Sequence, residues 1–163
     1  MREERLAGLT VRVTGGQDGK GAGDGASIVL LHGFGAPGND LVSLAEAIPV
    51  PPGTRFFFPA APLSLQRGFG DSRAWWMLDL ERRNREMAAG LARDLSRDVP
   101  VGLAEARAKV LSLLDELERR YKIDPRRTVL GGFSQGAMLA CDVALRMDRP
   151  LAGLVLLSST LLA

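Results

Sequence analysis

Short apolar runs alternate with amphipathic segments along the 163 residues of this chain. Five runs are rich in β-branched or bulky apolar side chains and have the length of strands. They span residues 9–14, 27–31, 54–58, 128–130 and 151–158. The first alternates apolar and polar positions, which predicts a half-buried strand at a sheet edge. The uninterrupted run 27–31 and the last run predict buried strands of the kind found inside parallel sheets.

Segments with helical periodicity separate most of these runs. The helices are expected at 40–48, 85–97, 102–121 and 135–147. In the third, an apolar stripe is formed by Leu103, Ala106, Val110, Leu113, Leu114 and Leu117. Asn39 or Asp40 is positioned to cap the first of them. Residues 60–71 contain Pro62 and two glycines, and they are predicted to be irregular. Because strands and helices alternate and the strands are apolar, we expect residues 1–163 to form a single domain with an open, mainly parallel α/β sheet.

Composition narrows the class of protein. The apolar fraction of 46% and the charged fraction of 25% are ordinary for a globular domain. The net charge is only +2, and arginines are interleaved with acidic residues, so no basic face and no nucleic-acid partner are expected. A single cysteine, Cys141, excludes an intrachain disulfide and a cysteine-cluster zinc site, and no metal or cofactor is expected.

Two further observations concern location. No apolar run approaches the length that a membrane-spanning helix needs, so no membrane span is expected. The N-terminal residues 1–5 are mostly charged and lack the hydrophobic segment of a secretory signal peptide. We therefore expect the protein to be cytoplasmic.

The most informative motif is Gly132-Phe133-Ser134-Gln135-Gly136, which lies between a predicted strand and a predicted helix. In that context a Gly-x-Ser-x-Gly sequence predicts a sharp turn that holds its serine in a strained conformation above the sheet. Glycines are needed at both ends because side chains there would collide across the turn. The free N–H groups at the start of the helix suit a developing negative charge. A nucleophilic Ser134 is favoured over an incidental serine in a glycine-lined turn.

Two other loops follow predicted strands. His32-Gly33-Phe34 comes after run 27–31, and a long loop after Phe58 leads to Trp75 and Trp76. The carboxyl ends of parallel strands meet at one edge of a sheet, where ligands bind. The two tryptophans could be core residues, but paired aromatic side chains beside a candidate site favour a pocket wall.

These segments together carry a resemblance to a known family. They are, in chain order, Leu30-Leu31-His32-Gly33-Phe34-Gly35, Phe58-Pro59-Ala60-Ala61-Pro62, Ala74-Trp75-Trp76 and Gly131-Gly132-Phe133-Ser134-Gln135-Gly136-Ala137-Met138. From about Leu9 to Leu162 the chain resembles the phospholipase/carboxylesterase family of α/β-hydrolases, which includes bacterial carboxylesterases and acyl-protein thioesterases. The resemblance implies an α/β-hydrolase-type fold, a mostly parallel sheet with helices on both faces.

The resemblance also implies roles for individual residues. Ser134 would attack the carbonyl of a small-molecule ester or acyl substrate, and the backbone N–H groups of Phe34 and Gln135 would form the oxyanion hole. His32 would shape the oxyanion loop instead of acting as the base, and the glycines at positions 33, 132 and 136 would support the site. The candidate acyl-binding wall consists of Leu63, Phe69, Trp75, Trp76 and Met77.

The chain departs from the family pattern after Ser134. A serine nucleophile needs a histidine base oriented by a carboxylate, and in this fold both follow the serine along the chain. Only Asp142 and Asp148 follow it here, both on or just after the next helix, and no histidine does. The chain is therefore interpreted as an incomplete α/β-hydrolase domain that lacks the last strands and the terminal helix, with the Asp and His expected on a missing or separate C-terminal segment.

Three explanations remain open. The chain could be the N-terminal part of a serine esterase of carboxylesterase or lysophospholipase type, in which case a complementary C-terminal segment or a second copy should cover the apolar edge of strand 151–157. It could instead be an isolated product with weak activity from the oxyanion hole and substrate binding. It could also be a catalytically inactive ligand-binding or assembly module that shares the fold.

Overall fold

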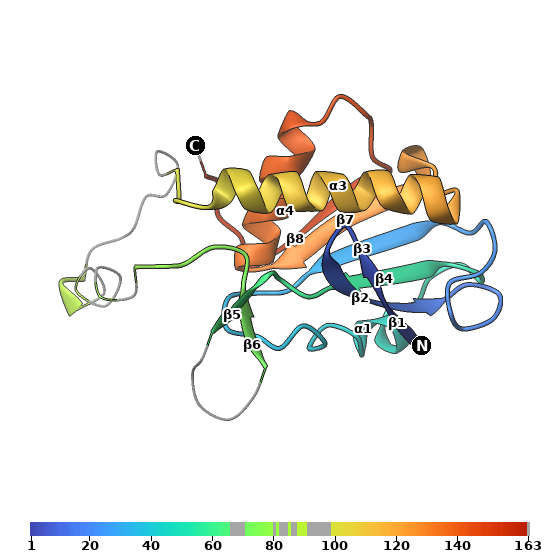
Figure 1. Ribbon diagram of the computed structural model, residues 1–163, viewed down its shortest axis with the longest axis horizontal. Coiled ribbons are helices and arrows are strands. Elements are labelled where there is room, and N and C mark those ends of the chain that lie inside the picture. The colour runs from blue at the N-terminus through green and yellow to red at the C-terminus, as the bar shows by residue number, and fades with distance from the viewer. Residues whose placement is uncertain (66–70, 80, 82–84, 86–87, 91–98, 163) are drawn as a thin grey trace.

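A mixed sheet forms the centre of the computed structural model, which describes residues 1–65, 71–79, 81, 85, 88–90 and 99–162. Within these residues six strands pair in the order β1-β2-β4-β3-β7-β8 (Figure 1). They are β1 (Arg2–Leu6), β2 (Leu9–Gly15), β3 (Ser27–Leu31), β4 (Arg55–Pro59), β7 (Thr128–Phe133) and β8 (Gly153–Leu157). The four strands β4, β3, β7 and β8 are parallel, whereas β1 and β2 are antiparallel to their neighbours. The prediction of a mainly parallel α/β sheet is confirmed.

Helices lie on both faces of the sheet, as predicted, but unequally. The long helix α3 (Leu103–Tyr121) and α4 (Gln135–Arg146) cover one face (Figure 1). The main hydrophobic core lies beneath them and includes side chains of both helices. The short helix α1 (Leu44–Ala47) packs on the other face against Phe56 and Phe58 of β4. Phe57 points the opposite way, into the main core, so the alternation of side chains along β4 connects the two layers.

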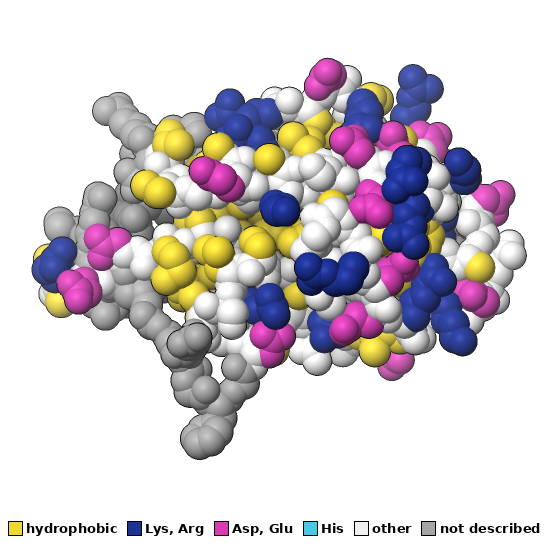
Figure 2. All heavy atoms as spheres, in the orientation of Figure 1, with side chains coloured by type: hydrophobic (Ala, Val, Ile, Leu, Met, Phe, Trp, Pro, Cys, Tyr) yellow, Lys and Arg dark blue, Asp and Glu magenta, His cyan; other side chains and the backbone are white. Residues whose placement is uncertain are grey.

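Helix α3 forms where the sequence predicts a helix, and its buried positions are those of the predicted apolar stripe. They are Leu103, Ala106, Val110, Leu113, Leu114 and Leu117. Charged residues occupy the opposite side of the helix, as expected for a helix that packs on a sheet. Side chains of both charge signs are spread over this face of the molecule (Figure 2). Among the described residues no helix is both long enough and apolar enough to cross a membrane.

The position of β2 corrects one prediction. Residues 9–14 do form a strand, but it lies between β1 and β4 and not at the sheet edge. The edge is β1, which the sequence analysis treated only as a charged N-terminus. Ala7 and Gly8 connect the two strands, and both have positive φ angles, 48° and 75°, as a tight hairpin requires. The charged side chains of β1 suit an edge strand, because they discourage pairing with other chains.

The helix predicted over 40–48 is much shorter than expected. Only the four residues of α1 are helical, and its N-cap is Ser43 instead of Asn39 or Asp40. The preceding residues form successive turns with bonds to the third residue back, for example from the N–H of Val42 to the carbonyl of Asn39. The β-branched Val42 and the polar Ser43 have low helical propensity. The conformation before α1 is therefore set by the packing of apolar residues on β4, not by helical propensity.

Two segments of the loop region also require comment. Residues 60–71 were predicted to be irregular, but Leu63–Leu65 (β5) and Ser72–Ala74 (β6) pair as an antiparallel two-stranded sheet. The described N-terminal part of that segment is thus more regular than predicted. The helix predicted over 85–97 falls mostly outside the described residues.

Strand β8 occupies the second edge of the sheet, and it is apolar. Its last four residues, Leu154 to Leu157, are 37–41% exposed. The prediction that this run is a buried strand is therefore wrong for the chain as described. The strand lies at an edge because no described residue pairs with its outer side, which leaves unpaired backbone groups next to apolar side chains.

Candidate active site

Ser134 lies in a strained turn between β7 and α4. Its backbone angles are φ 51° and ψ −115°, outside the regions that non-glycine residues ordinarily adopt. Its own N–H donates to the carbonyl of Leu157 at the end of β8 at 2.9 Å, and its carbonyl accepts the first helical bond, from Met138. The side chain is half-buried and caps no N–H group of the helix. The geometry agrees with the predicted strand-to-helix elbow.

The two glycines of the motif allow the elbow to pack against β3. A Cβ atom on Gly136 would lie 2.1 Å from the carbonyl oxygen of Leu31, and one on Gly132 would lie 2.5 Å from the same oxygen. Both contacts are with backbone, which cannot move aside as a flexible side chain could. Glycine is thus required at both positions by the close approach of the turn to the end of β3.

The loop after β3 lies beside the serine. A Cβ atom on Gly33 would lie 3.5 Å from the Cβ of Ser134, so the following peptide borders the nucleophile. No described residue accepts a hydrogen bond from the N–H of Phe34 or of Gln135. Gln135 is the first residue of α4, where N–H groups lack helical partners. Among the described residues both N–H groups thus lack an acceptor, as the donors of an oxyanion hole would.

The β5–β6 hairpin holds this loop in place. The N–H of Gly35 donates to the carbonyl of Arg73 at 2.8 Å, and the N–H of Arg73 donates to the carbonyl of Ala36 at 3.1 Å. The hydroxyl of Ser72 adds a bond to the carbonyl of Gly35 at 2.7 Å. This support was not predicted from the sequence. Its signal was two short segments on either side of a glycine-containing stretch, the pattern of a hairpin.

His32 is buried and makes hydrogen bonds through both ring nitrogens. Its Nε2 accepts from the N–H of Ala61 at 2.9 Å, so the proton resides on Nδ1, which donates to the carbonyl of Gly33 at 2.8 Å. Burial lowers the pKa of the imidazole, which favours the neutral ring. Both nitrogens are occupied by backbone groups, which matches a role in shaping the loop and leaves no nitrogen to act as a base.

The predicted acyl wall divides into three groups. Trp75 and Trp76 are only 2% and 1% exposed and belong to the main core, which favours the core-packing alternative. Leu63 and Met77 are exposed, at 38% and 56%, so their role in binding an acyl chain stays a prediction. Phe69 lies outside the described residues.

The two carboxylates that follow Ser134 do not face it. Asp142 is buried between α3 and α4, where it forms ion pairs with Arg107 at 2.5 Å and with Arg146 at 2.9 Å. Asp148 is exposed beyond the end of α4. In the described part of the chain no carboxylate and no imidazole contacts the hydroxyl of Ser134. The described residues thus place two N–H groups without acceptors near Ser134 and bring no base to its hydroxyl.

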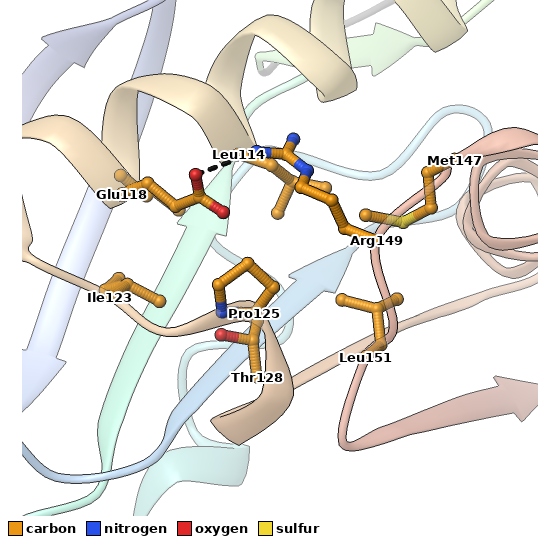
Figure 3. A pocket seen from close by; sticks show the side chains of 9 residues that line it. Leu114, Glu118, Ile123, Pro125, Thr128, Met147, Arg149 and Leu151 are labelled. Atoms are coloured by element: carbon orange, nitrogen blue, oxygen red, sulfur yellow. Dashed lines mark hydrogen bonds and ion pairs between the residues drawn. The ribbon is translucent and has the colours of Figure 1, made fainter.

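An apolar cavity lies at the opposite end of the parallel strands (Figure 3). Leu114 and Glu118 of α3, together with Met147 and Leu151, are among the residues that line it, and Thr128 at the start of β7 closes it below. Its volume of about 10 Å³ is no larger than a single water molecule needs. Ser134 follows the other end of β7, so this cavity does not belong to the candidate site.

The fold and the elbow define an α/β-hydrolase, and comparisons with known proteins give its family. A sequence profile of the phospholipase/carboxylesterase family matches residues 20–163. The chain therefore belongs to that family. It is 29% identical over 147 residues to acyl-protein thioesterase 1 of Emericella nidulans, an alignment that covers 84% of this chain and 57% of the relative.

Solved structures give the same result. The crystal structure of esterase PE8 superposes with a TM-score of 0.73 at 30% identity and covers 95% of this chain and 66% of that one. A carboxylesterase from Mesorhizobium loti has the same fold, with a TM-score of 0.71 at 19% identity over 99% of this chain and 67% of that one. The 163 residues thus span between about half and two thirds of the length of these relatives.

Replacement of Gly136 by alanine should destabilise the protein strongly. The added Cβ would overlap the backbone of Leu31, and relief would require moving the elbow away from β3. We expect a loss of at least about 2 kcal/mol in the free energy of unfolding, measured by urea denaturation. Gly153→Ala is the matched control, because a Cβ there meets its nearest neighbour at 3.8 Å. Equal stabilities for the two variants would contradict the required close approach.

Acid should destabilise the fold through His32, the sole histidine of the chain. Its folded pKa lies below the ordinary 6.5, so below that pH the unfolded chain binds a proton that the folded protein does not. The contribution is complete above pH 6.5 and falls as the pH decreases, by at most about 1.4 kcal/mol per pH unit. Urea midpoints between about pH 7.5 and 5.5 measure it. A His32→Gln variant should lose the slope, and an unchanged slope would contradict the assignment.

Proposed function

We propose that this chain carries the nucleophile and the oxyanion hole of a serine carboxylic-ester hydrolase. The hydroxyl oxygen of Ser134 attacks the carbonyl carbon of an ester or thioester, and its proton passes to a base. The carbonyl oxygen becomes an oxyanion that accepts hydrogen bonds from the N–H groups of Phe34 and Gln135. Donors already aimed at this position are each worth about 3–4 kcal/mol of transition-state stabilisation.

The observation that carries this proposal is the conformation of Ser134. For a non-glycine residue, the backbone angles φ 51° and ψ −115° are unfavourable in free energy. The conformation persists here because the turn packs closely against β3 at Gly132 and Gly136. An incidental serine would not require such a turn. The strain has a use if it exposes a nucleophile at the carboxyl end of β7, where ligands bind in open α/β sheets.

The described residues supply no base to Ser134. The one imidazole of the chain is bonded to backbone on both sides, and Asp142 is paired with two arginines. We propose that a complementary C-terminal segment supplies the histidine and its carboxylate and that it packs along β8. The end of β8 is suited to this because the carbonyl of Leu157 bonds the N–H of Ser134, so a segment paired with β8 would pass close to the serine.

The substrate class follows from the relatives. One is named an acyl-protein thioesterase and another an esterase, and both reactions proceed by attack on an acyl carbonyl. Both a carboxylic ester and an acyl-thioester fit the same nucleophile and the same oxyanion hole. The exposed side chains of Leu63 and Met77 are the described apolar candidates for contact with the acyl chain.

Labelling by a fluorophosphonate tests the nucleophile. The reagent should attach to Ser134, detected by mass spectrometry, and the rate should rise at least about tenfold when the C-terminal third of a family carboxylesterase is supplied as a separate chain. Hydrolysis of a short p-nitrophenyl ester should follow the same order, and Ser134→Ala should abolish both signals.

The opposite result has a definite meaning. If Ser134 stays unlabelled even in the presence of the complementing segment, the chain is a ligand-binding or assembly module with the hydrolase fold. If Ser134→Ala hydrolyses the ester as fast as the parent chain, the activity does not arise at this serine.

The open edge of β8 gives a separate prediction. Four apolar residues exposed at 37–41% on an unpaired strand should bind the complementary segment or, in its absence, a second copy of the chain. Light scattering together with intact mass should therefore show an oligomer or an additional peptide. Val155→Lys should weaken the association, whereas Leu145→Lys on the exposed side of α4 should leave it unchanged. A stable monomer with nothing bound would contradict the prediction.

A further inference from the structure

The side chain of Gln135 is buried beside the nucleophile, although only its backbone N–H has a role in the proposed oxyanion hole. It is 2% exposed, and its amide makes two hydrogen bonds to the segment that follows β6. The Oε1 atom accepts from the N–H of Trp75 at 2.9 Å, and the Nε2 atom donates to the carbonyl of Trp76 at 2.9 Å. The amide thus satisfies a donor and an acceptor of two consecutive residues, which fixes its orientation.

The segment that Gln135 holds is the same one that holds the oxyanion loop. Only Ala74 separates Trp75 from Arg73, which exchanges backbone hydrogen bonds with Gly35 and Ala36. Ser72 adds the bond from its hydroxyl to Gly35. The β5–β6 hairpin accordingly lies beside the chain that leaves β3 (Figure 1). Residues 72–76 therefore contact α4 through the side chain of Gln135, and they contact the loop of Phe34 through Ser72 and Arg73.

A second contact strengthens this connection. The indole N–H of Trp75 donates to the carbonyl of His32 at 3.0 Å, and the imidazole of His32 bonds Gly33 and Ala61. Both sides of the loop that carries Phe34 are thereby attached to residues 72–76. All of these groups are buried or half-buried, so their hydrogen bonds are not exchanged freely with water.

We infer that the side chain of Gln135 is a positioning residue that fixes the distance between the two oxyanion donors, the N–H groups of Phe34 and Gln135. The inference rests on the proposed function, because it assigns a role to the same site. One donor lies in the loop after β3 and the other at the start of α4, and among the described residues no hydrogen bond joins Phe34 or Gly35 directly to α4. The path from Gln135 through residues 72–76 to Gly35 connects them. Loss of the side-chain amide should loosen one donor relative to the other.

Two substitutions separate positioning from mere stability. Gln135→Met keeps the length of the side chain and removes both hydrogen bonds. Gln135→Glu keeps the acceptor for Trp75 but can donate to the carbonyl of Trp76 only when its carboxyl is protonated. Asp142→Asn is the matched control, because it weakens buried ion pairs of α4 and leaves the bonds of residues 72–76 intact.

The first readout is the rate of fluorophosphonate labelling of Ser134 in the chain supplied with its complementing segment. We expect Gln135→Met to label at least about tenfold more slowly, since removal of one oxyanion donor costs about 10²–10³ in rate. The rate of Gln135→Glu, divided by that of the parent at each pH, should recover as the pH falls and the carboxyl becomes protonated. Asp142→Asn should label at the parental rate.

The second readout does not depend on catalysis. Hydrogen exchange at the N–H of Gly35 and of Trp75 should accelerate about tenfold in Gln135→Met and stay unchanged in Asp142→Asn. Parental labelling rates in both Gln135 variants, or a pH-independent defect in Gln135→Glu, would overturn the inference. If the parent itself is never labelled, the proposed function fails. Hydrogen exchange at Gly35 in Gln135→Met then tests by itself whether the side chain of Gln135 holds the loop. Exchange at the parental rate would show that it does not.

Discussion

The packing of the elbow against the end of β3 is the contact on which the rest of the site depends. Gly132 and Gly136 approach the carbonyl oxygen of Leu31 so closely that no Cβ atom fits at either position. That contact determines where α4 begins and forces Ser134 into its strained conformation. It also places the loop after β3 beside the serine. The positions of Ser134 and of the two proposed oxyanion donors thus follow from one close approach between two strands and a helix.

The elements with a strong local pattern could be predicted from the sequence. The stripe of α3 is buried at each predicted position, and the Gly-x-Ser-x-Gly motif forms the expected turn. The wrong predictions concern elements whose position or length depends on their neighbours in the fold. The sequence of residues 9–14 does not tell whether the strand lies at the edge or inside the sheet. The outer neighbour, β1, is charged and has no apolar pattern that would predict a strand. Similarly, residues 41–43 form turns that pack on β4, although the apolar spacing of 41–48 is helical.

The sequence could predict Ser134 and the backbone groups of the candidate site, but not its long-range side-chain contacts. The motif identifies Ser134 and the N–H groups near it, because the fold requires those groups at fixed positions along the chain. The bonds of Gln135 to Trp75 and Trp76 connect residues about sixty positions apart, and no periodicity indicates them. The same holds for the two tryptophans, whose burial depends on their packing in the main core. Long-range polar contacts of this kind are visible only in three dimensions.

The environment of His32 has a practical consequence for the study of this site. It is the one imidazole in the 163 residues. Its Nδ1 atom bonds Gly33 in the loop after β3, and its Nε2 atom bonds Ala61. Its ring resonances in an NMR spectrum therefore form an isolated, unambiguous set. Their chemical shifts depend on the hydrogen bonds of both nitrogens, so a natural side chain serves as a spectroscopic probe of loop geometry without any introduced label.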